Sequence, residues 1–173
     1  MKTLLTLLTC LFILSPNVVL GETVKIKDLV KRGGLYYEKF TDVPFSGKTT
    51  GKIQGTFNNG RKDGAWAAYH DNGHLRSKGS YKNGKKNGLW TNYYFDQTSL
   101  VQNGRIKSKG NYKNDKREGL WVHYHPFTEG EIRATGKYEN GKEEGPWVHY
   151  HPIDGTIFKG GTGTYRNGNK VYD

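Results

Sequence analysis

The chain has 173 residues, of which 34% are hydrophobic and 13% aromatic, with 27 basic and 16 acidic residues. This composition excludes a thick core of Leu, Val and Ile and favours a thin sheet stabilised by cross-strand Tyr and Trp contacts. The formal net charge of +11 favours anionic partners. The single cysteine, Cys10, lies in the leader described next, so the rest of the chain has no disulfide or thiolate ligand.

Residues 1–21 have the pattern of a secretory signal peptide. Lys2 precedes an apolar run from Leu4 to Leu14, and Gly21 is the small residue before the expected cleavage site. A membrane anchor is the alternative, but a run of about 11 apolar residues is too short to span a bilayer. A lipoprotein signal at Cys10 would leave a very short apolar region. We therefore expect an exported protein that is periplasmic, cell-surface or secreted.

Residues 22–54 are predicted to form an N-terminal cap with a degenerate repeat. Ile26 to Arg32 is compatible with a helix or a strand, Gly33-Gly34 marks a turn, and Leu35 to Phe40 has strand composition. Phe45 to Gly51 resembles the second half of a repeat unit. A terminal unit is usually atypical because it covers an otherwise open edge.

Residues 55–173 are built on one recurring frame. From Gly79 to Trp90 it runs Gly, any residue, aromatic, any residue, Asn-Gly, three polar residues, Gly, a small or apolar residue, Trp. The frame recurs at 55–66, 110–121 and 136–147, and a truncated copy begins at Gly163. The sequence therefore predicts repeat units near 55–78, 79–109, 110–135 and 136–162, and a partial unit at 163–173.

The Asn-Gly pairs predict tight hairpins, because both residues tolerate the positive φ of a type I′ turn. Each unit should give one strand ending at this turn and one carrying Trp-x-x-Tyr. The predicted fold is all-β: an elongated antiparallel meander of hairpins in which sequence neighbours pair. Length differences fall between the Tyr and a later Gly, so those loops should share one edge. The glycines predicted in these turns are Gly60, Gly84, Gly141 and Gly168.

The aromatic residues of the frame are predicted to be structural. Trp and Tyr are three positions apart, which places them on opposite faces of a regular strand, whereas a bulge would bring them together. Both arrangements are compatible with the sequence. Their fixed position favours packing over stacking on a ligand, and no nucleic-acid partner is expected for an exported protein. These residues are Trp66, Trp90, Trp121, Trp147, Tyr69, Tyr93, Tyr124 and Tyr150.

The frame Asn-Gly-x-x-x-Gly-x-Trp-x-x-Tyr, over about residues 45–170, resembles the variant MORN repeat of bacterial proteins in the YwqK-type antitoxin-like family. The resemblance implies a meander of β-hairpins and neutralisation of a partner toxin. Similarity to other MORN arrays implies membrane or phospholipid contact and dimerisation. Because the export signal does not fit an antitoxin of a cytoplasmic toxin, such a role would belong in the cell envelope.

Basic residues cluster around the predicted turns and should form a positive stripe, because turns of one type share an edge. The stripe could bind an anionic partner, or it could consist of solvated hairpin tips whose lysines discourage aggregation. In the fourth unit it gives way to Lys142-Glu143-Glu144. The predicted stripe residues are Arg61, Lys62, Lys82, Lys85, Lys86, Lys113, Lys116 and Arg117.

The remaining chemical motifs predict no cofactor, no metal and no catalysis. His123-Tyr-His125 could chelate an ion, and so could the equivalent His149 and His151, because residues two apart share a face of a strand. Equivalent histidines of successive units, however, would lie two strands apart, about 10 Å, which is too far for one four-histidine site. The sequence also has no phosphate-binding loop and no nucleophile elbow.

These observations predict an exported, non-enzymatic scaffold that binds a protein or an anionic envelope component. The first alternative is an antitoxin or immunity protein that neutralises a partner toxin. The second is a peripheral module that contacts anionic membranes through its basic stripe. A homo-oligomer is compatible with each of these.

Overall fold

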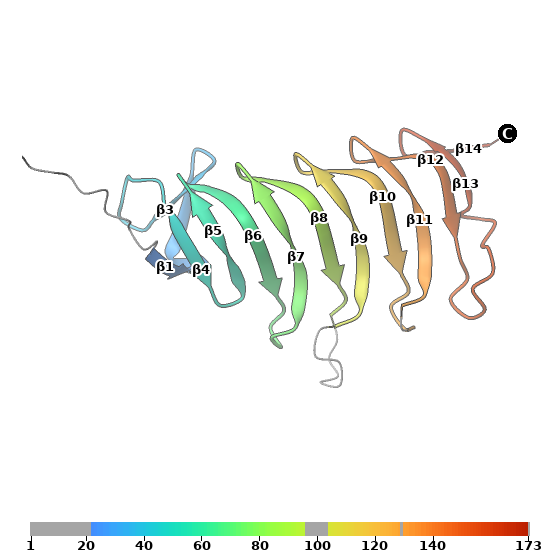
Figure 1. The fold of residues 1–173 in the computed structure, drawn as a ribbon, viewed down its shortest axis with the longest axis horizontal. Helices are drawn as coiled ribbons and strands as arrows, with labels where there is room; N and C mark the ends of the chain where they lie inside the picture. Colours follow the sequence, from blue (N-terminus) through green and yellow to red (C-terminus); the bar gives the residue numbers. More distant parts are fainter. Residues whose placement is uncertain (1–21, 96–103, 129, 173) are drawn as a thin grey trace, which may run out of the picture.

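The computed structural model describes residues 22–95, 104–128 and 130–172. The predicted signal peptide with Cys10, and residues 96–103 in the long loop of the second unit, lie outside the described residues. The described chain forms a long twelve-stranded sheet with a separate two-stranded hairpin at its N-terminal end (Figure 1). Within these ranges, no helix is long and apolar enough to cross a membrane.

The sheet is the predicted all-β meander. From β4 to β14, strands adjacent in sequence pair antiparallel in unbroken order, so all of these contacts are local. At the N-terminal edge, β1 instead pairs parallel with β4. The strands of this sheet are β1 (Glu22–Lys25), β4 (Gly47–Thr50), β5 (Ile53–Asn58), β6 (Arg61–Tyr69), β7 (Leu75–Lys82), β8 (Lys85–Tyr93), β9 (Ile106–Lys113), β10 (Lys116–Tyr124), β11 (Ile132–Glu139), β12 (Lys142–His149), β13 (Gly163–Arg166) and β14 (Asn169–Val171).

The N-terminal segment forms a second small sheet that packs against the first strands of the large one. A 3₁₀ turn, Ile26–Asp28, leads into the antiparallel hairpin of β2 (Leu29–Arg32) and β3 (Leu35–Glu38). Buried Leu29 joins one hydrophobic cluster with Phe45 and Phe57. The backbone N–H of Tyr36 donates to the carbonyl of Gly60 at 2.8 Å and fixes the hairpin to the first turn.

The Asn-Gly turns have the predicted geometry. In these pairs Asn has φ of 51–53° and Gly has φ of 74–89°, as a type I′ turn requires. The third turn contains Asn114-Asp115, and Asp115 adopts φ of 69° where the other units have glycine. Asp tolerates this conformation better than most residues. Its carboxylate accepts a hydrogen bond from the backbone N–H of Lys86 at 2.8 Å, which ties the third turn to the second.

Successive turns are bonded side by side along one edge of the sheet, the upper edge in Figure 1. The N–H of each second turn residue donates to a backbone carbonyl just after the preceding turn. The other connections between strands lie along the opposite edge, as predicted (Figure 1). The turn-to-turn bonds run from Gly84 to Lys62 (2.8 Å), Asp115 to Lys86 (3.1 Å), Gly141 to Arg117 (3.0 Å) and Gly168 to Glu143 (2.9 Å).

Each Trp side chain lies across a glycine of the preceding strand. A Cβ added to this glycine would come within 2.0–2.3 Å of the indole, too close for any side chain. These glycines do not have the positive φ of the turn glycines, so it is close approach and not backbone conformation that requires glycine here. The pairs are Gly55 with Trp66, Gly79 with Trp90, Gly110 with Trp121 and Gly136 with Trp147.

A bulge precedes every Trp. In β10, Glu118 pairs with Asn111 of β9 and Trp121 pairs with Gly110, which leaves Gly119 and Leu120 without partners in β9. Gly119 has φ of 69°, and the equivalent glycines of the other units have φ of 71–81°. The residue between this glycine and Trp is left exposed: Leu120 keeps 59% of its surface. The bulge therefore places an apolar side chain in solvent at a fixed position of the unit.

Candidate binding surfaces

The face of the sheet that carries the indoles, here called the inner face, is a continuous ladder of aromatic rings. Neighbouring rings meet edge to face with centroids 5.1–6.3 Å apart. Each such pair contributes about 0.5–1.5 kcal/mol beyond its burial. The ladder runs Phe57, Trp66, Tyr81, Trp90, Tyr112, Trp121, Tyr138, Trp147 and Tyr165.

The indoles of the ladder are packed and hydrogen-bonded. Trp90, Trp121 and Trp147 are at most 1% exposed. The N–H of Trp121 donates to the backbone carbonyl of Asn111 at 3.0 Å, and Trp90 and Trp147 make equivalent bonds. Because both the rings and these N–H groups are already satisfied within the sheet, these tryptophans are packed as part of the fold.

The tyrosine three positions after each Trp belongs to the opposite face, here called the outer face. The hydroxyl of Tyr69 donates to the side chain of Gln54 at 3.5 Å, and the ammonium of Lys109 lies 5.6 Å from the ring centre of Tyr124. Among the described residues, none of these tyrosines makes a ring contact with a Trp. The pairing register with the following strand does shift beside Tyr69, Tyr93 and Tyr124, but this shift does not turn their rings toward the inner face. Of the two predicted arrangements, the one that places Trp and Tyr on opposite faces of the strand is therefore correct.

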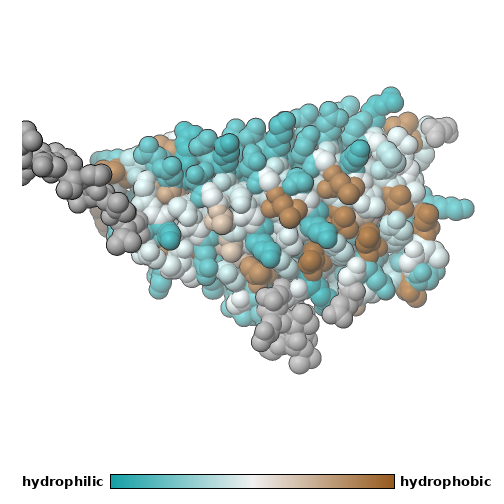
Figure 2. Space-filling view, in the orientation of Figure 1, coloured by the Kyte–Doolittle hydropathy of each residue, from teal (hydrophilic) through white to brown (hydrophobic). Residues whose placement is uncertain are grey.

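The prediction of one exposed basic stripe is wrong for three of its eight residues. Lys62, Lys86 and Arg117 are half-buried, and their cationic groups lie 4.3–4.7 Å from the centres of Trp66, Trp90 and Trp121 on the inner face. Strand alternation is the reason, because the second residue after each turn points inward. The other five, Arg61, Lys82, Lys85, Lys113 and Lys116, are exposed along the turn edge, where Figure 2 shows a hydrophilic band.

The outer face combines apolar and basic rows on alternate strands. The uncharged residues are on β8, β10 and β12, with Tyr150 immediately after β12: Leu89, Thr91 and Tyr93, then Leu120, Val122 and Tyr124, then Pro146, Val148 and Tyr150. The basic residues are on β7, β9 and β11: Arg76, Lys78, Lys82, Lys107, Lys109, Lys113, Arg133 and Lys137. Figure 2 shows hydrophobic patches interspersed with hydrophilic ones on the face turned to the viewer.

Carboxylates do not neutralise these basic rows. Within the described ranges the ion pairs are Arg32 with Asp42 and Lys52 with Asp71, and neither involves β7, β9 or β11. Of the residues in these rows, the sequence predicts only Lys82 and Lys113 as charged-surface residues, because they lie beside the turns. The period-two alternation of basic residues in Leu75–Lys82 and Ile106–Lys113 was the signal that could have found the others.

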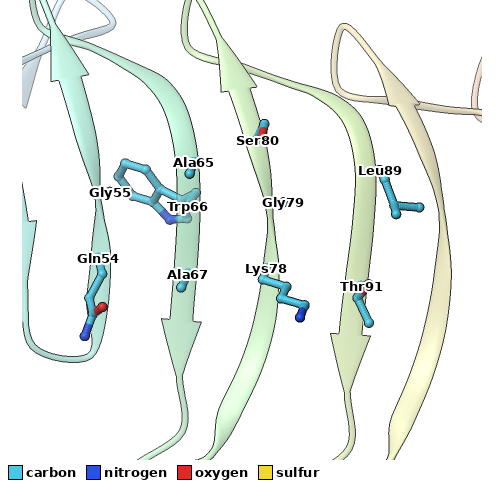
Figure 3. Close-up of a pocket in the computed structure, with 10 residues that line it drawn as sticks. All are labelled: Gln54, Gly55, Ala65, Trp66, Ala67, Lys78, Gly79, Ser80, Leu89 and Thr91. Carbon is cyan, nitrogen blue, oxygen red and sulfur yellow. The ribbon is translucent and has the colours of Figure 1, made fainter.

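An open hollow of about 460 Å³ lies on the outer face of the first two units (Figure 3). It exists because Ala65 and Ala67 occupy positions where the second unit has Leu89 and Thr91. Gly79 also contributes to its lining, and the side chains of Lys78, Leu89 and Thr91 lie beside it. The outer face can therefore receive an apolar side chain of a partner beside a lysine.

A second hollow, of about 490 Å³, lies where the N-terminal hairpin meets the turn edge. Four cationic side chains line it, together with one carboxylate, Asp115. Burial lowers the pKa of Lys62, and repulsion by Lys31 and Lys86 lowers it further. The four basic residues are Lys31, Arg61, Lys62 and Lys85.

His123 and His149, one of each histidine pair, belong to the inner face. His123 stacks on Trp121 with centroids 6.1 Å apart, and burial, reinforced by Arg117, lowers the pKa of His123 to about 4. A ring nitrogen of His125 meets the carbonyl of Tyr150 at 3.2 Å. Residues 22–95, 104–128 and 130–172 contain no group of three or more His, Cys, Asp or Glu that could hold a metal ion.

Comparison with known protein families finds no match for this chain, and comparison with curated proteins finds no relative. The resemblance to variant MORN repeats therefore stays a prediction from the sequence frame.

Proposed function

We propose that this protein is an exported, non-enzymatic scaffold whose outer sheet face binds an acidic protein partner. The observation that supports this most strongly is the alternation of uncompensated basic rows with exposed apolar rows. The proposal includes no catalytic role and no cofactor. Export is part of it and rests on the pattern of residues 1–21.

The apolar rows supply the binding energy. Leu89 and Leu120 remain 62% and 59% exposed at the bulges, where nothing in the sheet covers them. Fully burying a leucine side chain contributes about 1.5–3 kcal/mol, so covering the exposed part of both by a partner would give roughly 1–2 kcal/mol each toward the affinity. A few such anchors commonly dominate the energy of an interface.

The basic rows supply orientation and partner choice. Basic side chains on both sides of the β8 and β10 rows favour a partner with carboxylates around an apolar patch and disfavour a basic one. An antitoxin or immunity role is a special case of this proposal, in which the acidic partner is a toxin. Binding to an anionic polymer or membrane is the competing function, because such binding would depend on the basic side chains and would not require burial of Leu89 and Leu120.

Affinity capture from the envelope fraction of the source organism tests the proposal. The baits are the wild-type chain, the L89S/L120S variant, and the F127S/I153S variant, which removes two exposed apolar residues from loops. We expect an acidic protein to be captured by the wild type and by F127S/I153S but lost with L89S/L120S. Equal capture by all three baits, or capture only of anionic lipid or polymer that is lost at high salt, would refute the proposal.

A further inference from the structure

The hollow at the turn edge is a built cationic site, distinct from the outer face. The Gly33-Gly34 turn of the N-terminal hairpin forms one side of it, and the turns at Gly60 and Gly84 form the other. Tyr36 is part of its lining, and the ammonium groups of Lys31 and Lys62 lie 5.7 and 5.9 Å from the centre of its ring. Residues far apart in sequence therefore place two cations over a single ring.

The positive charge in this hollow is only partly balanced by the protein, because four cationic side chains and one carboxylate line it. Among the described residues, Lys31, Arg61, Lys62 and Lys85 form no ion pair with a carboxylate. The one acidic residue in the lining, Asp115, already accepts the backbone N–H of Lys86 at 2.8 Å. The pKa of Lys62 is lowered mainly by burial and further by repulsion from Lys31 and Lys86, whereas attraction by Asp115 partly offsets this lowering.

The fold maintains this arrangement. The hairpin is held to the first turn by the bond from Tyr36 to Gly60, and the second turn is held to the first unit by the bond from Gly84 to Lys62, both at 2.8 Å. Lys62 is further fixed by the rings of Trp66 and Tyr81, at 4.6 and 4.9 Å. Lys62 is therefore already in place before a ligand arrives, which reduces the entropic cost of binding.

We propose that this pocket binds an oligoanionic ligand carrying several phosphoryl groups. Phosphoryl oxygens match ammonium and guanidinium donors, and one phosphate could not engage all four cations around a hollow of this size. The phosphoryl groups could belong to a soluble oligophosphate or to the head groups of an anionic surface. The chemistry recognised by the pocket is the same in both cases.

Isothermal titration calorimetry with tripolyphosphate tests the pocket directly. The variant K31Q/K85Q removes two exposed cations of the pocket and leaves Lys62, which packs on the aromatic ladder, unchanged. The matched control K113Q/K116Q removes the same charge around the next turn, outside the pocket. We expect K31Q/K85Q to weaken binding by about tenfold or more, and the control by less than about threefold. Equal weakening in both variants, or no binding by the wild type, would overturn the proposal.

Vesicle sedimentation identifies the source of the phosphoryl groups. Vesicles of phosphatidylglycerol that bind the wild type and K113Q/K116Q, but not K31Q/K85Q, would assign lipid head groups as the ligand. Tripolyphosphate binding without vesicle binding would assign a soluble oligophosphate. The L89S/L120S variant should bind tripolyphosphate like the wild type, so failure of the protein-partner proposal would not affect this result.

Discussion

A Cβ atom at Gly110 would lie 2.3 Å from the indole of Trp121, although the two residues are directly paired across β9 and β10. Replacing Gly110 with Ala should therefore destabilise the protein by about 1–3 kcal/mol, the usual range for overpacking. Chemical denaturation measures the change, and Asn111→Ala, at the exposed neighbouring position, serves as the control. A loss no larger than that of the control would mean that the indole does not lie over Gly110.

Replacing Trp121 with Ala should be more damaging than Gly110→Ala. The ring is fully buried, contacts Tyr112 and Tyr138, and donates its N–H to Asn111. We expect a loss of about 3–5 kcal/mol in the free energy of unfolding. If denaturation shows a change within experimental error, the inner face is not the core of the protein.

The turn geometry predicts a graded response at Gly84. This residue has φ of 82°, and a β-branched side chain resists that conformation, so Gly84→Val should cost about 1–2 kcal/mol. Asp115 adopts φ of 69° at the same place in the next turn, so Gly84→Asp should cost clearly less. Melting temperatures of the two variants provide the comparison. Equal shifts, or none, would argue against a type I′ turn.

Stability should fall on acidification through His123. Its folded-state pKa is lowered to about 4 from an ordinary value of 6.5, so the unfolded chain takes up a proton first. The contribution of neutral His123 is fully present above about pH 6.5 and is lost as the pH falls toward 4. The lowered pKa of His149 acts in the same direction.

The variant His123→Phe isolates this effect because it keeps an aromatic ring on Trp121 without a titratable group. Between pH 7 and pH 4.5 the wild type should lose about 1–2 kcal/mol relative to the variant, after allowance for partial exposure of the imidazole. Urea denaturation at both pH values measures the difference. A wild type and variant whose stabilities stay parallel would show that His123 is not buried in its neutral form.

The sequence predicts the meander well because its signals are local. Asn-Gly fixes the turns, and alternation fixes the strands between them. The pairing of Glu22–Lys25 with Gly47–Thr50 was not predicted, because a parallel contact across more than 20 residues has no local signature. The glycines at 55, 79, 110 and 136 were seen as part of the frame, but their role depends on where the indole of the next strand points.

The candidate site was predictable only in part. Lys62, Lys86 and Arg117 are each four positions before a Trp. Because side chains alternate between the two faces of a strand, and a two-residue bulge keeps that alternation, this even spacing predicts that they lie on the same face as the indoles. The pocket of Lys31 could not be predicted, because it depends on how the N-terminal hairpin packs against the first turn.

Photo-cross-linking from the outer face tests the central claim most directly. A benzophenone amino acid replaces Leu120, exposed beside the lysines of β9 and β11, or Phe127, which is even more exposed in a loop. In cells of the source organism, we predict a cross-link to an acidic protein from position 120 and none from position 127. Absence of a cross-link from position 120, or the same products from both positions, would contradict binding through this face.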